Sequence, residues 1–366
     1  MTDKTEQKLT NLVTKILKER DHSDYSRLSI FPVKDFKYYE LYYRSEGQRW
    51  PESDIDPLND LPDFDGLSDR AKFVILAIVS FFLVGDAVVN EAMIRFLLDY
   101  IISIKKGKSM PLERINMIIS QMSMETIHQG SYTITGLTFV KSMEKLEELL
   151  KVASTTPEMR AKIEFSEKWT ESNTPAWQRF VANSAMEGIG FVAAFAVIFY
   201  FRSINKLKEF VTLNELIAKD EFLHREMCVV QALDELDLTV EDEMPKEVED
   251  VIRQIIRDAV EVEDKFADYL LSENLDDFNK EDLKLYIRCI ANSLLAMYGL
   301  NAEWDAENPF DWMNSVNMEV KGNMFETNVV AYSNAQLSRM LDWESRAGLK
   351  EASTTSHLIK PEDVDF

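Results

Sequence analysis

The stretch Glu125-Thr-Ile-His128 returns in the same frame as Glu221-Phe-Leu-His224, and together the two hold half of the four histidines in the chain. Residues three positions apart share a face of an α-helix, so each stretch predicts a helix that presents a carboxylate and an imidazole to one point. Such mixed donors are typical of iron and manganese sites. The motif is short enough to occur by chance, so its interpretation depends on the surrounding sequence.

Each of these stretches follows an apolar segment that carries one isolated acid. Asp86 lies 39 residues before Glu125, and Glu187 lies 34 residues before Glu221. A buried carboxylate without a partner is rare, because removing its charge from water costs several kcal/mol. Two helices with one carboxylate each and two with Glu-x-x-His form the inward-facing ligand set of di-metal carboxylate bundles. We therefore predict a di-metal site rather than four unrelated buried acids.

Helix signals are spread along most of the chain, whereas its 11 glycines and 10 prolines are too few for a turn-rich β architecture. The expected helices run from the Ser68 cap to about Lys105, from beyond Pro111 towards Val152, from Thr174-Pro175 to about Arg202, from a capping box at Thr212–Glu215, from Pro245, and from Asn279 to Gly299. Long helices with short connections predict an all-α bundle.

A single helical domain is expected over residues 1–335. Within it, residues 1–67 are rich in proline and aspartate and are expected to form an irregular lead-in. Near the C-terminus the composition turns polar, so residues 336–366 are expected to form a mobile tail.

Composition limits the classes of function. The formal net charge of -23 disfavours binding to nucleic acid or to an anionic membrane surface. The two apolar runs, Phe73–Val84 and Ile189–Phe201, are too short to span a bilayer and predict buried core helices. The polar N-terminus does not resemble a signal peptide, and the two distant cysteines, Cys228 and Cys289, suit a reducing compartment. A cytoplasmic location is therefore expected.

Four segments together resemble the metal-ligand segments of the small subunit of class I ribonucleotide reductase: Gly85–Glu91, Met124–His128, Met186–Ile189 and Lys219–His224. Their order and spacing agree with that family, and the resemblance extends from about Phe31 to Tyr332. It implies a ferritin-like helical bundle with two iron ions, manganese being the other metal that fits. The implied ligands are Asp86, Glu125 and His128 for one ion and Glu187, Glu221 and His224 for the other, with Glu125 and Glu221 bridging.

The resemblance also implies a stored radical. Tyr132 lies four residues after His128, hence on the same helix face, and matches the family's radical tyrosine, although a lone tyrosine there is more often a core residue. Phe191, Phe195 and Ile217 match the apolar pocket around that radical. Asp220, Trp50 and Tyr332 match the family's radical-transfer residues.

By this resemblance the chain uses dioxygen to generate and store a tyrosyl radical that initiates ribonucleotide reduction in a separate large subunit. The last residues, Pro361–Phe366, are similar to the family's docking tail, with Phe366 as the apolar anchor, and a homodimer is implied. A solvated, disordered end is the alternative for the tail. Because the same fold serves other functions, a di-iron oxygenase or oxidase and an iron-storage protein stay open as alternatives.

Overall fold

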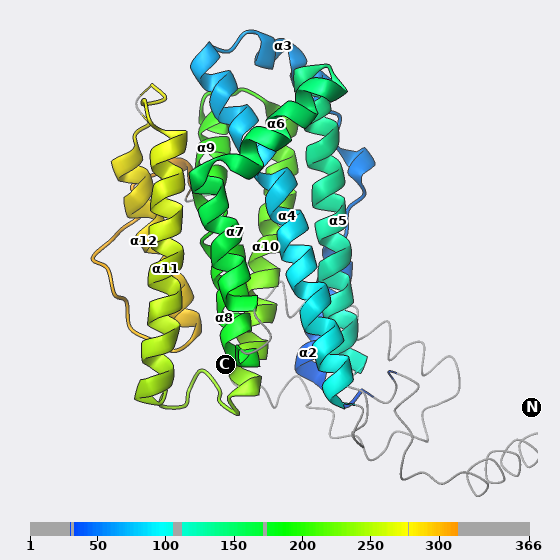
Figure 1. Ribbon diagram of the computed structural model, residues 1–366, viewed down its shortest axis with the longest axis vertical. Helices are drawn as coiled ribbons and strands as arrows, with labels where there is room; N and C mark the ends of the chain where they lie inside the picture. Colours follow the sequence, from blue (N-terminus) through cyan, green and yellow to red (C-terminus); the bar gives the residue numbers. More distant parts are fainter. Residues whose placement is uncertain (1–29, 31–32, 105–111, 171–173, 277, 314–366) are drawn as a thin grey trace, which may run out of the picture. The chain divides into compact units, whose positions relative to one another are not determined.

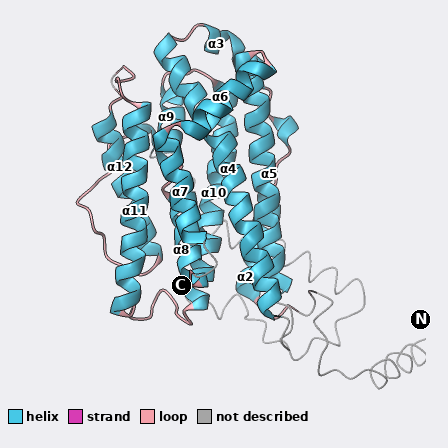
Figure 2. Cartoon of the chain, in the orientation of Figure 1, coloured by secondary structure: helices cyan, strands magenta, loops and turns pink. Residues whose placement is uncertain are grey.

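A computed structural model describes residues 30, 33–104, 112–170, 174–276 and 278–313, without the side chains of residues 86–89, 92, 95–104 and 170. Helices dominate this part of the chain, as Figure 2 shows, and it contains no strand beyond one isolated bridge between Leu275 and Phe278. The predicted all-α class is therefore confirmed.

The main helices can be followed in Figure 1. They are α2 (Phe36–Gln48), α3 (Leu61–Asp65), α4 (Asp69–Ile104), α5 (Leu112–Val140), α6 (Met143–Thr155), α7 (Pro157–Thr170), α8 (Ala176–Gly188), α9 (Val192–Ser203), α10 (Lys208–Glu235), α11 (Lys246–Leu270) and α12 (Lys280–Met297). Two short 3-10 helices, η1 (Glu52–Asp54) and η2 (Pro57–Asp60), lie between α2 and α3.

Two helix pairs form the centre of the bundle. The most extensive helix packing is that of α10 on α8, followed by that of α4 on α5, and α10 also contacts α5. On one side α2 packs on α5, and on the other α11 packs on α12 and α7. The predicted metal ligands lie on the four central helices.

Several predicted helix ends are confirmed. Ser68 caps α4, its Oγ accepting from the backbone N–H of Ala71 at 3.2 Å. Asn279 caps α12 by accepting from the N–H of Asp282 at 2.9 Å. Just beyond α12, Gly299 adopts a φ of 72°, a left-handed conformation that glycine tolerates best.

The prediction of one helix from beyond Pro111 towards Val152 is wrong, because the chain turns after α5. Lys141 has a φ of 59°, which ends α5. Ser142 then caps α6, its Oγ accepting from the N–H of Lys145 at 3.3 Å. Serine is a typical N-cap residue, so Ser142 was the signal in the sequence for this helix boundary.

The single helix predicted from Thr174-Pro175 to about Arg202 is also interrupted, between Gly188 and Val192. Gly190 has little room for a side chain, since an added Cβ would lie 2.9 Å from the carbonyl oxygen of Met186. The backbone groups at the break are met by side chains from other helices. Lys162 of α7 donates to the Gly190 carbonyl, and Glu263 of α11 accepts from the Ala193 N–H.

The capping box predicted at Thr212–Glu215 is not a helix start, because α10 already begins at Lys208. Its N-terminal amides are capped by Asp60, whose two carboxylate oxygens accept from Glu209 and Phe210 at 3.1 and 2.7 Å. A cap that comes from a distant segment leaves no signal in the sequence next to the helix that it caps.

The irregular lead-in expected for residues 1–67 is wrong for Phe36–Gln48, which forms α2. Its Tyr38, Tyr39 and Leu41 are buried, so helix formation there is stabilised by packing rather than by local propensity. The predicted tail at 336–366, with Phe366, lies outside the described residues, as does Tyr332.

The segment Ala176–Ser203 is long and apolar enough to cross a membrane by length and composition alone. Its apolar window is completely buried inside the bundle. It therefore belongs to the protein core, as the apolar run Ile189–Phe201 predicted.

Candidate metal centre

Side chains from three helices converge in the middle of the bundle. Glu125, Glu187, Glu221 and His224 each offer one ligand atom, and these atoms all lie within 4.8 Å of one another. All four side chains are buried. The predicted ligand His128 joins the same cluster, whereas the side chain of Asp86, on α4, lies outside the described residues.

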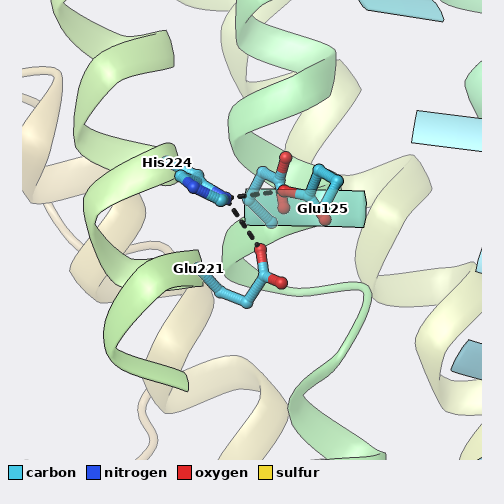
Figure 3. A group of neighbouring side chains, drawn as sticks. Glu125, Glu221 and His224 are labelled. Atoms are coloured by element: carbon cyan, nitrogen blue, oxygen red, sulfur yellow. Dashed lines mark ion pairs between the residues drawn. The ribbon is translucent and has the colours of Figure 1, made fainter. Parts of the chain in front are cut away.

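The two glutamates of the Glu-x-x-His motifs lie between the two histidines. His224 Nδ1 is 2.7 Å from Glu125 Oε1 and 3.4 Å from Glu221 Oε2. The dashed lines in Figure 3 mark these two ion pairs. His128 Nδ1 is 3.0 Å from Glu221 Oε1 and 3.3 Å from Glu125 Oε2. Each of the two carboxylates therefore reaches both imidazoles, which is compatible with the bridging role that the family resemblance implies for Glu125 and Glu221.

The cluster fits a pair of divalent cations. Among the described side chains, Glu187 Oε2 is buried without a hydrogen-bond partner. The buried carboxylates of Glu125 and Glu221 face the two imidazoles across the cluster. Buried polar atoms are normally satisfied, and buried charges are normally paired or bound to metal. A donor set of carboxylates and imidazoles matches what iron and manganese prefer.

The pKa values of the side chains alone point the same way. Burial, reinforced by the charges of Glu221 and Glu125, raises the pKa of Glu187 well above its usual value. Burial lowers the pKa of His224, but Glu125 and Glu221 outweigh it and raise that pKa to about 9. The three buried carboxylates of Glu125, Glu187 and Glu221 can therefore lie this close together only when protons or cations compensate their charge.

A buried hydrogen-bonded chain leads away from the cluster. His128 Nε2 lies 3.1 Å from Asp220 Oδ2, and the same oxygen accepts from Trp50 Nε1 at 2.8 Å. The Trp50 ring lies roughly parallel to that of His128, with centroids 6.0 Å apart. With Nε2 donating to the carboxylate, the Nδ1 lone pair of His128 faces the cluster, the usual arrangement of a metal-bound histidine.

Tyr132 is fully buried on α5, one turn beyond His128. Its hydroxyl donates to Asn214 Oδ1 at 2.6 Å, and its ring stacks on that of Phe82 with centroids 4.4 Å apart. The predicted pocket residues Phe191 and Phe195 are buried and pack on Phe82, at 5.4 and 5.5 Å between ring centroids. The predicted pocket residue Ile217 is also fully buried.

Sequence reasoning missed three residues at this centre. Phe82 lies four residues before Asp86, and Gln121, which donates to Glu187 Oε1 at 3.1 Å, lies four residues before Glu125. Asn214 lies seven residues before Glu221, inside the stretch Thr212–Glu215 that the sequence predicts to be a capping box. Each shares a helix face with a predicted ligand, so the four- and seven-residue spacing was the available signal.

A helical bundle in which two Glu-x-x-His motifs and a further glutamate converge belongs to the ferritin-like class of di-metal carboxylate proteins. Comparison with known proteins gives the family. The family model for the ribonucleotide reductase small chain matches residues 27–309, so the chain belongs to this family and is an oxidoreductase subunit.

Individual relatives agree. The chain is 30% identical over 319 residues to ribonucleoside-diphosphate reductase subunit M2 of Danio rerio, covering 87% of this chain and 77% of that one. It is 30% identical over 308 residues to the ribonucleoside-diphosphate reductase small chain of Plasmodium falciparum. The match covers 84% of this chain and 83% of that one. The oxygenase and iron-storage alternatives are not favoured by these matches.

Solved structures share the fold at lower identity. The dimanganese(II) NrdF of Streptococcus sanguinis superposes with a TM-score of 0.68 at 19% identity, covering 80% of this chain and 98% of that one. The Rnr4 homodimer of Saccharomyces cerevisiae gives 0.66 at 23% identity, covering 88% and 98%. These likenesses support the ferritin-like bundle.

Proposed function

We propose that this chain uses two iron ions and dioxygen to generate and store a radical on Tyr132, which initiates ribonucleotide reduction in a separate large subunit. The observation that carries the proposal is the full burial of Tyr132 one turn beyond His128, beside the carboxylate and imidazole cluster. The bound metal ions supply one-electron oxidation with dioxygen, and the protein supplies their geometry and surroundings.

The ligand assignment is the one that the family resemblance implies, and the described part of the cluster is compatible with it. One ion would be held by Asp86, Glu125 and His128 and the other by Glu187, Glu221 and His224, and Glu125 and Glu221 would be shared. Gln121 donates to Glu187 and leaves the other carboxylate oxygen of that side chain for the metal. Manganese suits the same donors, so iron is chosen here by the expected reaction with dioxygen.

The rings around Tyr132 keep it from water and from reductants. Phe82 covers one face of the phenol, and Phe191 and Phe195 cover Phe82 in turn. With Ile217 they form an apolar enclosure, and a phenoxyl radical survives only where such exclusion holds.

Oxidising equivalents leave through buried hydrogen bonds. Asp220 accepts from Trp50 and contacts His128, so the three groups join the cluster to a residue just beyond α2. We propose that Tyr332 continues this route to a thiol of the large subunit. The tail over residues 336–366 docks there through Phe366, and the small subunit works as a homodimer in the cytoplasm.

The test is electron paramagnetic resonance of the full-length protein after addition of iron(II) and dioxygen. The wild type should give a tyrosyl radical signal, and Tyr132→Phe should abolish it. Tyr298→Phe is the matched control, because Tyr298 is also buried and its hydroxyl lies 2.8 Å from Ser184 Oγ. A radical that survives Tyr132→Phe, or that disappears in the control, would contradict the assignment.

A further inference from the structure

The hydroxyl of Tyr132 donates to a buried amide, that of Asn214. Asn214 lies on α10, fully buried, with its Oδ1 2.6 Å from the Tyr132 hydroxyl. Its Nδ2 donates to the backbone carbonyl of Phe210, one turn earlier on the same helix, at 2.7 Å. The amide therefore bonds on both sides, once as donor and once as acceptor.

The orientation of this amide is fixed by chemistry. A carbonyl oxygen can only accept, so the Asn214 atom that faces the Phe210 carbonyl must be the nitrogen. The atom that faces Tyr132 is then the amide oxygen, which can also only accept. The hydroxyl proton of Tyr132 accordingly points at Asn214.

We propose that Asn214 is a positioning residue that stabilises the reduced phenol of Tyr132 relative to its radical, and so makes the radical a stronger oxidant. Oxidation converts the phenol to a phenoxyl radical with loss of one electron and one proton. Reduction of dioxygen, the oxidant of the proposed function, to water takes four electrons and four protons. Tyr132 would supply one of each, the two iron(II) ions two electrons on becoming iron(III), and an external one-electron reductant the fourth electron, with the remaining protons coming from water. The inference rests on that proposed function.

The asymmetry arises because the hydrogen bond exists in only one of the two states. A phenoxyl oxygen has no proton to donate, and Asn214 Oδ1 has none either, so two acceptors would face each other after oxidation. The amide could donate only by turning over, which would break its bond to the Phe210 carbonyl. One neutral buried hydrogen bond changes an equilibrium by about two- to tenfold, and here it favours the phenol.

The decisive variant is Asn214→Leu, which keeps the branched shape and the number of side-chain heavy atoms but cannot accept a hydrogen bond. The matched control is Gln231→Met, further along α10. Gln231 is also fully buried, its Nε2 donates to the Met227 carbonyl at 3.2 Å, and its Oε1 accepts from Arg114 Nε at 3.2 Å. Like Asn214, Gln231 donates to the backbone carbonyl four residues earlier and accepts one side-chain hydrogen bond, but it does not contact Tyr132.

The first measurement is infrared spectroscopy of the full-length, metal-free protein with isotopically labelled tyrosine. The difference between wild type and Tyr132→Phe isolates the C–O stretch of Tyr132. That band should have the frequency of a hydrogen-bond donor in the wild type and in Gln231→Met, and should shift in Asn214→Leu. A wild-type band typical of a free hydroxyl would overturn the inference even if Asn214→Leu failed to fold.

The second measurement is the lifetime of the radical in protein reconstituted with iron(II) and dioxygen, with ascorbate as reductant. The radical should persist about two- to tenfold longer in Asn214→Leu than in the wild type, and unchanged in Gln231→Met. A lifetime in Asn214→Leu equal to or shorter than that of the wild type would overturn the inference alone. The absence of any radical in the wild type would overturn the proposed function and this inference with it.

Discussion

The buried pair Lys162 and Glu263 stabilises the break between α8 and α9. Lys162 is 2% exposed and Glu263 is fully buried, and the ammonium contacts both the Glu263 carboxylate and the Gly190 carbonyl. The other Glu263 oxygen accepts from the Ala193 N–H at 2.8 Å, and the ammonium lies 3.8 Å from the Phe266 ring centroid. We predict that Lys162→Met strongly destabilises the protein although it lengthens no loop and opens no large cavity.

The magnitude follows from the charge that the substitution leaves behind. Burial already raises the pKa of Glu263 against the opposing effect of Lys162. Removing one partner of such a pair costs about 3–5 kcal/mol, because the other charge stays buried and unpaired. With an unfolding entropy of about 2.1 cal/mol/K per residue over 366 residues, the melting temperature should fall by about 4–7 °C.

The pH dependence has a definite sign. In Lys162→Met the pKa of Glu263 should rise further, so the folded state binds a proton more readily than the unfolded chain does. The stability deficit should then shrink as pH falls through the folded pKa of Glu263 towards its unfolded value, and grow as pH rises. The double variant Lys162→Met with Glu263→Gln removes both charges while keeping an acceptor for Ala193, so it should be more stable than Lys162→Met.

The assay is thermal unfolding of the metal-free protein, followed by circular dichroism, for the wild type, both single variants and the double variant. Lys168→Met is the matched control on the same helix. Its ammonium lies 2.8 Å from Asp258, but the Lys168 side chain is 57% exposed, and an exposed pair contributes about 0–1 kcal/mol. Additive losses in the double variant, or a Lys162→Met protein as stable as the control, would refute the reasoning.

Two further predictions concern the cluster and the glycines. Burial lowers the pKa of His224 and the neighbouring carboxylates raise it, to about 9, so metal binding must release its proton and manganese(II) affinity should rise with pH up to about 9. Calorimetric titration between pH 6 and 9 checks this, and a pH-independent affinity would count against it. Gly190→Ala should lower the midpoint of urea unfolding, because the added Cβ meets the backbone of Met186. Gly130→Ala should leave that midpoint equal or higher. Its Cβ meets the movable Glu52 carboxylate, and alanine favours the helix over glycine by about 1 kcal/mol.

The sequence predicted those parts of the protein that depend on spacing within one helix. The Glu-x-x-His frames placed Glu125 with His128 and Glu221 with His224 because three residues bring side chains to one face. Helix ends capped by their own neighbours, such as Asn279 of α12, were predicted for the same reason. The Glu-x-x-His pairs and the locally capped helix ends depend only on residues close together in the sequence.

Features made by partners far apart in the sequence were not predictable. Asp60 caps α10 from about 150 residues away, and Glu263 caps α9 from 70 residues away. The hydrogen bond from Tyr132 to Asn214 joins two helices 82 residues apart. A distant partner leaves no pattern near the group that it satisfies, so local rules gave Asn214 no role of its own within the predicted capping box.

The break after α8 is what separates the metal ligands from the apolar enclosure. In one continuous helix, Phe191 and Phe195 would follow Glu187 at four and eight residues on the same face, beside the carboxylates. With α8 ending at Gly188, both rings pack instead on Phe82, which covers Tyr132. One stretch of chain can therefore supply a carboxylate to the metal cluster and apolar rings to the surroundings of Tyr132. Because Lys162 and Glu263 stabilise the break, they help to position both.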